Sequence, residues 1–365
     1  MKICCVDELN LENKKVFVRI DIDSGSLNNK KILSSKLEIC LPTIKYIIDQ
    51  GAKVVIGTHL GIQNILGNKI TSIEEVGLLL SAMLNKDIFF LDEVYNDAFK
   101  KLMIDFGPGS VILLENLALL ESEIKNNDNF SSFISTKVDY YVNEAITLSN
   151  SSLASLYSVL DYFERDKIAI GLNFKYEFEN LNIIKNSAKK PFIVIINGKD
   201  VSQKVEFLGL LLDKIDKIIV MGIVSNSFNK VVATDFSGNY EKDALYSIKK
   251  LISSAKARNL EIIRTGVKAS SDKLEIDSNN LEYLLNLIQT ARNIIWIGPV
   301  EGMSDMEQSF KNSLAFKSTL GNEAYFSLNE SSYKNIFDYI STADTVSLDY
   351  LVDKPLIVIE KLREL

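Results

Sequence analysis

Polar side chains gather in loops that follow short apolar runs, and these loops are where chemistry is expected. The runs 16–20, 53–58 and 192–196 are typical of buried strands. Because ligands bind beyond the carboxyl ends of the strands in an open parallel sheet, the loops after such runs are the candidate sites. These loops offer carboxylate, imidazole, ammonium and hydroxyl groups, and they span residues 21–26, 59–61, 143–151, 197–204, 298–304 and 341–347.

The supply of arginine limits how these loops could hold phosphate. Only six of the 41 basic residues are Arg, and Arg19 is the one Arg among the first 164 residues. A guanidinium grips phosphate with two parallel hydrogen bonds, which an ammonium cannot copy. A genomic preference for Lys, Asn and Ile would account for the shortage equally well. In either case, the N-terminal half is poorly equipped to clamp a polyphosphate.

Alternating strand-like and helical segments must position the loops. This rhythm predicts parallel sheets covered by helices on both faces. The length of 365 residues suits two domains. A charged helical stretch at 171–186 is expected to connect them. Further strand-like runs lie at 111–114, 140–142, 218–222, 261–264 and 293–298, and helical patterns at 41–50, 73–84 and 240–257.

Composition excludes several classes of protein. Apolar residues make up 47% and charged residues 24%, as in ordinary globular proteins, and no apolar run approaches the roughly 20 residues that cross a bilayer. The net charge of −7 argues against nucleic-acid binding. Three cysteines (Cys4, Cys5, Cys40) form a poor disulfide framework, and with one His they argue against a structural zinc site. No signal-peptide core is evident, so a cytoplasmic setting is expected.

Short segments dispersed along the chain resemble the phosphoglycerate kinase family. They keep the order and spacing of that family from about residue 11 to the C-terminus. The segments are Val18-Arg19-Ile20-Asp21, Leu41-Pro42-Thr43-Ile44-Lys45-Tyr46, Thr58-His59-Leu60-Gly61, Leu113-Leu114-Glu115-Asn116-Leu117, Asp139-Tyr140-Tyr141-Val142-Asn143-Glu144-Ala145, Pro191-Phe192, Val201-Ser202 before Lys204, Trp296 with Gly298-Pro299, and Ser341-Thr342.

The resemblance implies an α/β fold of two Rossmann-like domains that face a cleft, with the C-terminal segment returning to the N-domain. It implies a phosphoglycerate-binding domain at 1–165, a connecting helix at 166–190, a nucleotide-binding domain at 191–345 and a returning segment at 346–365. The family reaction, part of glycolysis and gluconeogenesis, converts ATP and 3-phosphoglycerate to ADP and 1,3-bisphosphoglycerate with Mg. A monomer that binds 3-phosphoglycerate and adenine nucleotide is implied.

Several positions match the binding residues of the family. In the N-domain, Asp21, His59 and Lys36 match substrate-binding positions, although Asp21 could instead cap a turn and the lone His59 could be structural. In the C-domain, Lys204 matches a nucleotide-phosphate lysine, unless it is a solvated helix lysine. The other matches are Gly298 and Pro299 for nucleotide, Glu323 for the Mg-linked Asp, and Ser341, Thr342 and Asp344 for the phosphate turn.

Many phosphate-handling positions depart from the family. Asp200 stands where a lysine should approach the transferred phosphoryl group, with Lys199 beside it as a weak substitute. Ala343-Asp344-Thr345 replaces three glycines at a helix N-terminus, whose bare N–H groups would receive that group. We therefore hypothesise that the carboxylates of Asp200 and Asp344 either occupy the space that a bound phosphate would use or repel a phosphate from it. The other departures are Asp23 for Asn, Lys36 for Arg, Ile62 and Gln63 for Arg and Pro, Ala118 for Arg, Asn150-Ser151 for His-Arg, Met221-Gly222-Ile223 for a glycine triplet, Ile297 for Asn and Ser304 for Glu.

These losses decide which function the sequence favours. Removing one oxyanion-type donor costs about 10²–10³ in rate, and an arginine finger is worth about 10³–10⁵. The sequence therefore predicts a family member with strongly impaired or absent catalysis, acting as a binding or scaffold protein. Two alternatives stay open: an active kinase with a rearranged site, using Lys36, Lys199 and Lys204 with Mg and ATP, and another nucleotide- or sugar-phosphate-binding function.

Overall fold

Two compact units make up the chain, which was studied as a computed structural model. The first comprises Met1–Phe178 with Pro355–Leu365, and the second comprises Glu179–Lys354. Asp23, Ile62 and Gln63 lie outside the residues that the structure describes. Those described are residues 3–22, 30–61, 72–95, 97–105, 107–187, 189–233, 242–268, 273–276, 278–329 and 331–365.

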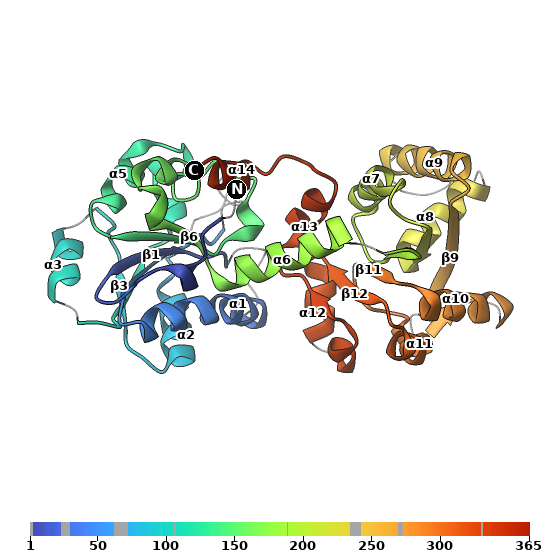
Figure 1. Ribbon diagram of the computed structural model, residues 1–365, viewed down its shortest axis with the longest axis horizontal. Helices are drawn as coiled ribbons and strands as arrows, with labels where there is room; N and C mark the ends of the chain where they lie inside the picture. The colour runs from blue at the N-terminus through green and yellow to red at the C-terminus, as the bar shows by residue number, and fades with distance from the viewer. Residues whose placement is uncertain are drawn as a thin grey trace. The chain divides into compact units, whose positions relative to one another are not determined.

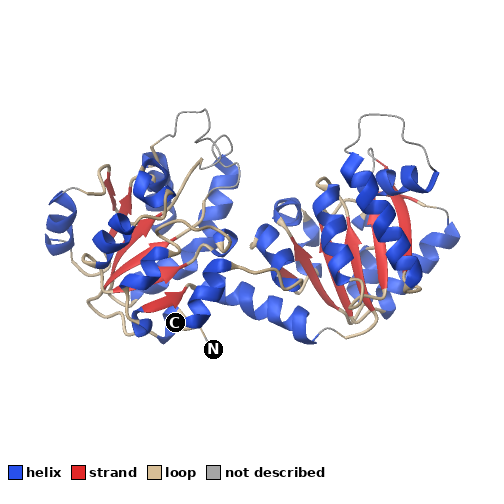
Figure 2. Ribbon diagram, turned by 90° about the horizontal axis from the view of Figure 1, so that it is seen from above, coloured by secondary structure: helices blue, strands red, loops and turns tan. Residues whose placement is uncertain are grey.

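The first unit is built on a six-stranded parallel sheet in the order β3-β4-β2-β1-β5-β6. Its strands are short and almost wholly apolar, as expected where helices cover both faces. Figure 2 shows this sandwich of strands between helices in each unit. The strands are β1 (Lys15–Arg19), β2 (Lys53–Gly57), β3 (Ile88–Leu91), β4 (Val111–Leu114), β5 (Tyr140–Asn143) and β6 (Ile168–Ile170).

Aromatic side chains fill the core of the first unit. The ring of Phe17 lies 6.0 Å from that of Tyr141 and 6.1 Å from that of Phe130. The covering helices include the C-terminal α14, which lies beside the N-terminus of the chain (Figure 1). They are η1 (Val6–Glu8), α1 (Lys30–Asp49), α2 (Glu74–Leu84), α3 (Asp97–Asp105), η4 (Leu117–Leu119), α4 (Glu121–Ile124), α5 (Asp128–Ser135), η5 (Ile146–Leu148), η6 (Ser158–Tyr162), η7 (Arg165–Lys167) and α14 (Ile357–Glu364).

The second unit holds a seven-stranded sheet in the order β10-β9-β8-β7-β11-β12-β13. Neighbouring strands are parallel except β9 and β10, which pair antiparallel at one edge. Trp296 is fully buried in a core with Phe310 and Phe337. The strands are β7 (Phe192–Ile196), β8 (Lys217–Met221), β9 (Glu261–Lys268), β10 (Lys273–Glu275), β11 (Asn293–Ile297), β12 (Phe316–Leu320) and β13 (Tyr339–Ile340).

Helices flank this second sheet as well, which confirms the expected α/β class with two parallel-sheet units. No helix in the described part of the chain is long and apolar enough to span a bilayer. The helices are α7 (Val201–Leu211), α8 (Gly222–Ala233), α9 (Lys242–Ala257), α10 (Ser278–Thr290), η8 (Met303–Asp305), α11 (Glu307–Asn312), α12 (Asn322–Asn329), η9 (Ser332–Ile336) and α13 (Asp344–Leu351).

The chain passes from the first unit to the second within α6 (Leu172–Ser187). Because β6 pairs with β5, the first unit continues past residue 165. Because α13 packs on β12, the second unit continues past residue 345, and only Pro355–Leu365 returns to the first.

Candidate functional site

The carboxyl ends of β1, β2 and β5 meet at one edge of the first sheet, since Arg19 pairs with both Gly57 and Asn143. The loop after β2 is fixed there by Asn116. Its side chain accepts a hydrogen bond from Leu60 N (3.2 Å) and donates one to Leu60 O (2.8 Å). The hydroxyl of Thr58 donates to Ile20 O at 3.0 Å. These bonds hold His59 in place between the ends of two strands.

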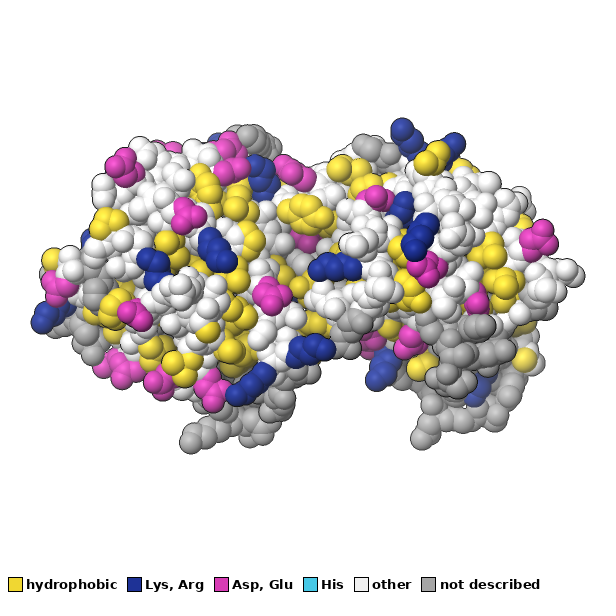
Figure 3. All heavy atoms as spheres, turned by 90° about the horizontal axis from the view of Figure 1, so that it is seen from below, with side chains coloured by type: hydrophobic (Ala, Val, Ile, Leu, Met, Phe, Trp, Pro, Cys, Tyr) yellow, Lys and Arg dark blue, Asp and Glu magenta, His cyan; other side chains and the backbone are white. Residues whose placement is uncertain are grey.

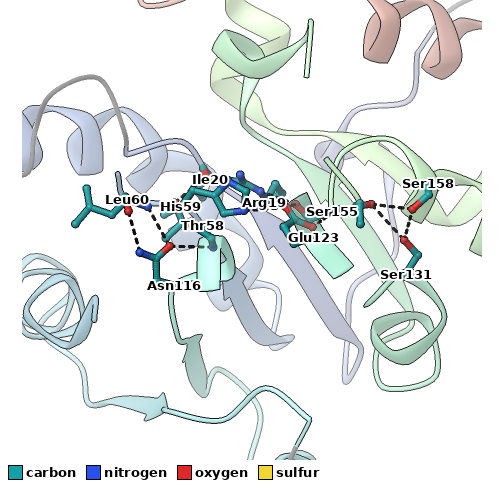
Figure 4. Close-up of polar contacts among 12 residues, drawn as sticks. Arg19, Ile20, Thr58, His59, Leu60, Asn116, Glu123, Ser131, Ser155 and Ser158 are labelled. Atoms are coloured by element: carbon teal, nitrogen blue, oxygen red, sulfur yellow. Dashed lines mark hydrogen bonds and ion pairs between the residues drawn. The ribbon is translucent and has the colours of Figure 1, made fainter. Parts of the chain in front are cut away.

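A buried polar chain runs from Arg19 to His59 (Figure 4). Arg19 Nε donates to Ser155 Oγ at 2.8 Å, and Ser155 Oγ donates to Glu123 Oε1 at 2.5 Å. The backbone N–H of Ser155 also donates to Glu123 Oε2, at 2.7 Å. His59 Nε2 completes the chain, 2.9 Å from Glu123 Oε1. The single Arg of the first 164 residues is thus part of an internal network.

Burial sets the ionisation of this network. It lowers the pKa of His59, and the positive charge of Arg19 lowers it further, so the imidazole is neutral at pH 7. Burial by itself raises the pKa of Glu123, but the contacts with His59, the charge of Arg19 and the Ser155 hydroxyl together lower it. His59 is 1% exposed, and no imidazole shows on the face drawn in Figure 3. The geometry therefore fits the structural interpretation of His59.

Asp21 and Lys36 form a second buried pair in the same unit. Lys36 Nζ lies 3.9 Å from Asp21 Oδ2, and both side chains are less than a tenth exposed. Thr147 Oγ1 donates to the same carboxylate oxygen at 2.5 Å. The structure thus brings two sequence-predicted site residues together and adds Thr147, a loop hydroxyl that the sequence did not single out.

A pocket of about 260 Å³ opens in the second unit, at the carboxyl ends of β11 and β12. Among the predicted site residues, it brings together Lys204, Gly298, Glu323, Asp200 and Asp344. Its walls are Asp200, Gln203, Lys204, Ile297, Gly298, Leu320, Gly321, Asn322, Glu323, Asp344, Thr345 and Leu348.

Lys204 is buried and already bonded within this pocket. Its Nζ lies 2.6 Å from Glu323 Oε2 and also donates to the carbonyl of Lys199. The backbone N–H of Lys199 donates to Glu323 Oε1 at 3.3 Å. The side chain of Lys204 is only 5% exposed, so it is not the solvated helix lysine that the sequence allowed.

Asp344 is the first residue of α13, and its carboxylate reaches the neighbouring helix α12. Its Oδ1 accepts the backbone N–H of Asn322, the first residue of α12, at 3.3 Å. A helix N-terminus attracts anions, and here the carboxylate of Asp344 meets the N-terminus of α12. Asp200 and Asp344 have φ of 53° and 49°, in the left-handed region that non-glycine residues rarely adopt.

The other predicted residues of the second unit hold its loops. Pro299 O accepts Trp296 Nε1 and Asn197 Nδ2, each at 3.0 Å. Gly298 has φ of 98°, and a Cβ there would lie 2.1 Å from Asn197 O. Ser341 Oγ accepts Ala343 N at 3.1 Å.

Glu323, the residue expected to hold Mg, makes other contacts in this arrangement. Both carboxylate oxygens of Glu323 contact nitrogen donors, from Lys204 and Lys199. Among the described residues, no group of three or more His, Cys, Asp or Glu side chains could hold a metal. Asp200 and Glu323 line one pocket without forming such a group.

Sequence reasoning did not find Glu123, Ser155 or Asn197 as members of these sites. Glu123 stands in Glu121-Ser122-Glu123, a pattern typical of an exposed helix start, and no local signal marks it as buried. Asn197, directly after β7, opens the loop 197–204 that the strand pattern indicated as a candidate site, but the residue itself was not singled out.

Fold and sites together define a two-domain protein of the parallel α/β class, with a polar site at the strand ends of each unit. A sequence model of the family "Phosphoglycerate kinase" matches residues 6–354. The chain therefore belongs to the phosphoglycerate kinase family, which confirms the resemblance seen in its motifs.

Individual relatives agree over nearly full length. The chain is similar to a phosphoglycerate kinase of Francisella tularensis subsp. novicida, with 28% identity over 397 residues, covering 100% of this chain and 99% of the relative. One from Bdellovibrio bacteriovorus is 28% identical, with coverage of 98% and 96%. The phosphoglycerate kinase structure from Coxiella burnetii matches with a TM-score of 0.79 and 25% identity, covering 100% of this chain and 99% of that one. The Pyrococcus horikoshii structure shares the fold, with a TM-score of 0.82, 23% identity, and coverage of 99% and 98%.

Proposed function

We propose that this chain is a phosphoglycerate kinase family protein whose phosphoryl transfer is strongly impaired or absent, and that it serves as a binding or regulatory protein. Phosphoryl transfer depends on positive charge and N–H dipoles around the moving group. The observation that carries the proposal is the carboxylate of Asp344 on the backbone N–H of Asn322, in the pocket where such dipoles are needed.

The charge of the pocket supports the proposal. Three carboxylates, Asp200, Glu323 and Asp344, line it, against the single ammonium of Lys204. That ammonium is bound to Glu323, so a nucleotide phosphate would have to displace a partner at 2.6 Å. Losing one oxyanion-type donor costs about 10²–10³ in rate, although such losses are not additive within one site.

The first unit supports the same conclusion. Two donors of Arg19 bond to Ser155 and to the carbonyl of Ile20, and Lys36 lies beside Asp21. His59 is buried against Glu123. Because these groups are engaged in stabilising the fold, we expect this edge of the sheet to bind phosphate weakly.

A second candidate is an active kinase with a rearranged site. One observation favours it: Lys204, Gly298 and Glu323 still line a single pocket. This function requires Lys204 to leave Glu323 when nucleotide binds. It also requires Mg and ATP, whereas the first proposal requires neither. Both candidates take the chain as a cytoplasmic monomer, and size-exclusion chromatography with light scattering would check the monomeric state.

Calorimetry and a coupled assay test the proposal. We expect no heat of binding for ATP with Mg, and no turnover with 3-phosphoglycerate above the protein-free rate. Restoring the family residues by Asp200→Lys with Asp344→Gly should produce measurable nucleotide binding. Asp213→Lys is the matched control for the Asp200→Lys single variant, because both change the charge by the same amount, and Asp213 lies on the surface of the same unit, where it pairs with Arg258.

Two results would overturn the proposal. The first is wild-type turnover in the range of about 1–100 s⁻¹, typical of kinases, that disappears in Lys204→Ala. The second is wild-type nucleotide binding as tight as that of the restored variant. An equal gain in the Asp213→Lys control would show that net charge, and not the pocket, limits binding.

A further inference from the structure

The first turn of α6 is held by side chains from elsewhere in the first unit. The first N–H groups of a helix have no partner within it. Here Leu172 N donates to Thr43 Oγ1 at 2.8 Å, and Asn173 N donates to Glu144 Oε1 at 3.0 Å. Phe174 N donates to Glu144 Oε2 at 3.2 Å. Two remote side chains, from α1 and from the loop after β5, thus cap the helix.

Glu144 and Thr43 form one tightly enclosed unit. The hydroxyl of Thr43 donates to Glu144 Oε1 at 2.7 Å while it accepts Leu172 N. Both side chains are buried. Gly171 makes room for the carboxyl group, because a Cβ at that position would lie 1.9 Å from Glu144 Oε2. The carboxyl group of Glu144 is therefore packed directly against the backbone of Gly171.

The environment of Glu144 places its titration near neutrality. Burial raises its pKa and is the largest effect. The hydrogen bonds from Thr43, Asn173 and Phe174 lower the pKa, and the buried carboxyl of Glu177, on the same helix, raises it. The balance lies at about 7.

The other titratable groups around this site do not compete for that proton. Burial raises the pKa of Cys40, on α1, well above its ordinary value, and raises that of Cys5 to about 12. Both thiols therefore stay protonated. Lys36, also on α1, lies beside Asp21. Asp21 acts with Glu144 on Cys40, and Glu177 is the carboxyl group that raises the pKa of Glu144.

We propose that Glu144 is a pH-sensitive latch on the first turn of α6. As a carboxylate it accepts all three hydrogen bonds. Oε1 already accepts two of them, so protonation falls on Oε2. That oxygen then carries the O–H and is a poorer acceptor, so its hydrogen bond from Phe174 N weakens. The chain passes from one unit to the other within α6. The latch therefore controls how firmly the first turn of this connecting helix is held. The proposal stands whether or not the chain is catalytic.

Backbone NMR of the full-length protein between pH 5 and 9 tests the latch. The amide resonances of Asn173 and Phe174 should titrate together with a midpoint of about 7, with the larger change at Phe174. Glu144→Gln should abolish this titration. Glu177→Gln is the matched variant on the same helix: it should keep the titration and lower its midpoint, because it removes the like charge.

A midpoint below pH 5, or a titration that persists in Glu144→Gln, would overturn the proposal. If Glu144→Gln fails to fold, the side-chain carboxyl carbons of ¹³C-labelled wild type give the answer. One Glu carboxyl titrating near pH 7, and shifting in Glu177→Gln, supports the latch. No Glu carboxyl titrating above pH 6 overturns it.

Discussion

His59 Nε2 lies 2.9 Å from Glu123 Oε1, and both side chains are buried. The resemblance predicted His59 as a substrate-binding residue, yet the imidazole faces an internal carboxylate. Through Ser155, the same carboxylate is linked to Arg19. A residue type suited to ligand binding therefore contributes to the core of the first unit.

The substitution Glu123→Gln should destabilise the first unit strongly. It removes the buried negative charge that contacts His59 and is linked to Arg19 through Ser155, and leaving a buried charge uncompensated costs about 3–5 kcal/mol. Denaturant unfolding of both proteins measures this cost. Glu121→Gln, two residues away in an exposed pair with Lys125, is the control and should leave the unfolding midpoint unchanged. Equal effects of the two variants would contradict the buried network.

Lys204 and Glu323 should be energetically coupled. Lys204→Met removes the ammonium that lies 2.6 Å from Glu323 Oε2, so the cost of Glu323→Gln should be smaller in that background. A double-mutant cycle from denaturant unfolding should give a coupling of about 0.5–3 kcal/mol. Additive effects would show that Lys204 is free to meet a phosphate.

Gly298 should not tolerate a side chain. An alanine Cβ would lie 2.1 Å from Asn197 O, and φ of 98° is strained for any L-residue. We expect Gly298→Ala to lower the free energy of unfolding by about 2 kcal/mol or more. Gly209→Ala is the matched control: Gly209 lies in α7 with open space around it, and alanine should stabilise the helix by about 0.5–1 kcal/mol. A stable Gly298→Ala protein would contradict the close approach of these loops.

Glu144 should make stability fall as pH rises. Its pKa is raised to about 7 in the folded chain, so the folded state binds a proton that the unfolded state releases near pH 4–5. Its stabilising contribution is therefore present below about pH 4.5 and is lost as pH rises through 7. The lowered pKa of His59 has the opposite effect. Its contribution to the stability of the fold is lost as pH falls below about 6.5.

Because several groups titrate, the pH prediction is checked as a difference. Denaturant unfolding at a series of pH values should show that wild type loses stability relative to Glu144→Gln between about pH 5 and 8. A flat difference would mean that Glu144 ionises alike in both states.

Local sequence pattern was sufficient for most elements but not for all of their bounds. The charged stretch 171–186 indicated a connector, and α6 spans Leu172–Ser187. The pattern at 41–50 indicated a helix, but α1 begins before Pro42, at least from Lys30. Leu33, Leu37, Ile44 and Ile47 are buried along one face of α1. This shared burial outweighs the break that a proline favours.

The sequence by itself determined the family and the α/β class, because order, spacing and apolar runs are properties of the chain. It also identified Lys204, Glu323 and Asp344 as candidate site residues. Only the tertiary structure decided their roles, because Lys204 meets Glu323 across 119 positions and Glu123 meets His59 across 64. Such pairings depend on which strand ends become neighbours in the sheet. Burial then converts an ordinary Glu, such as Glu144, into a group that titrates near pH 7.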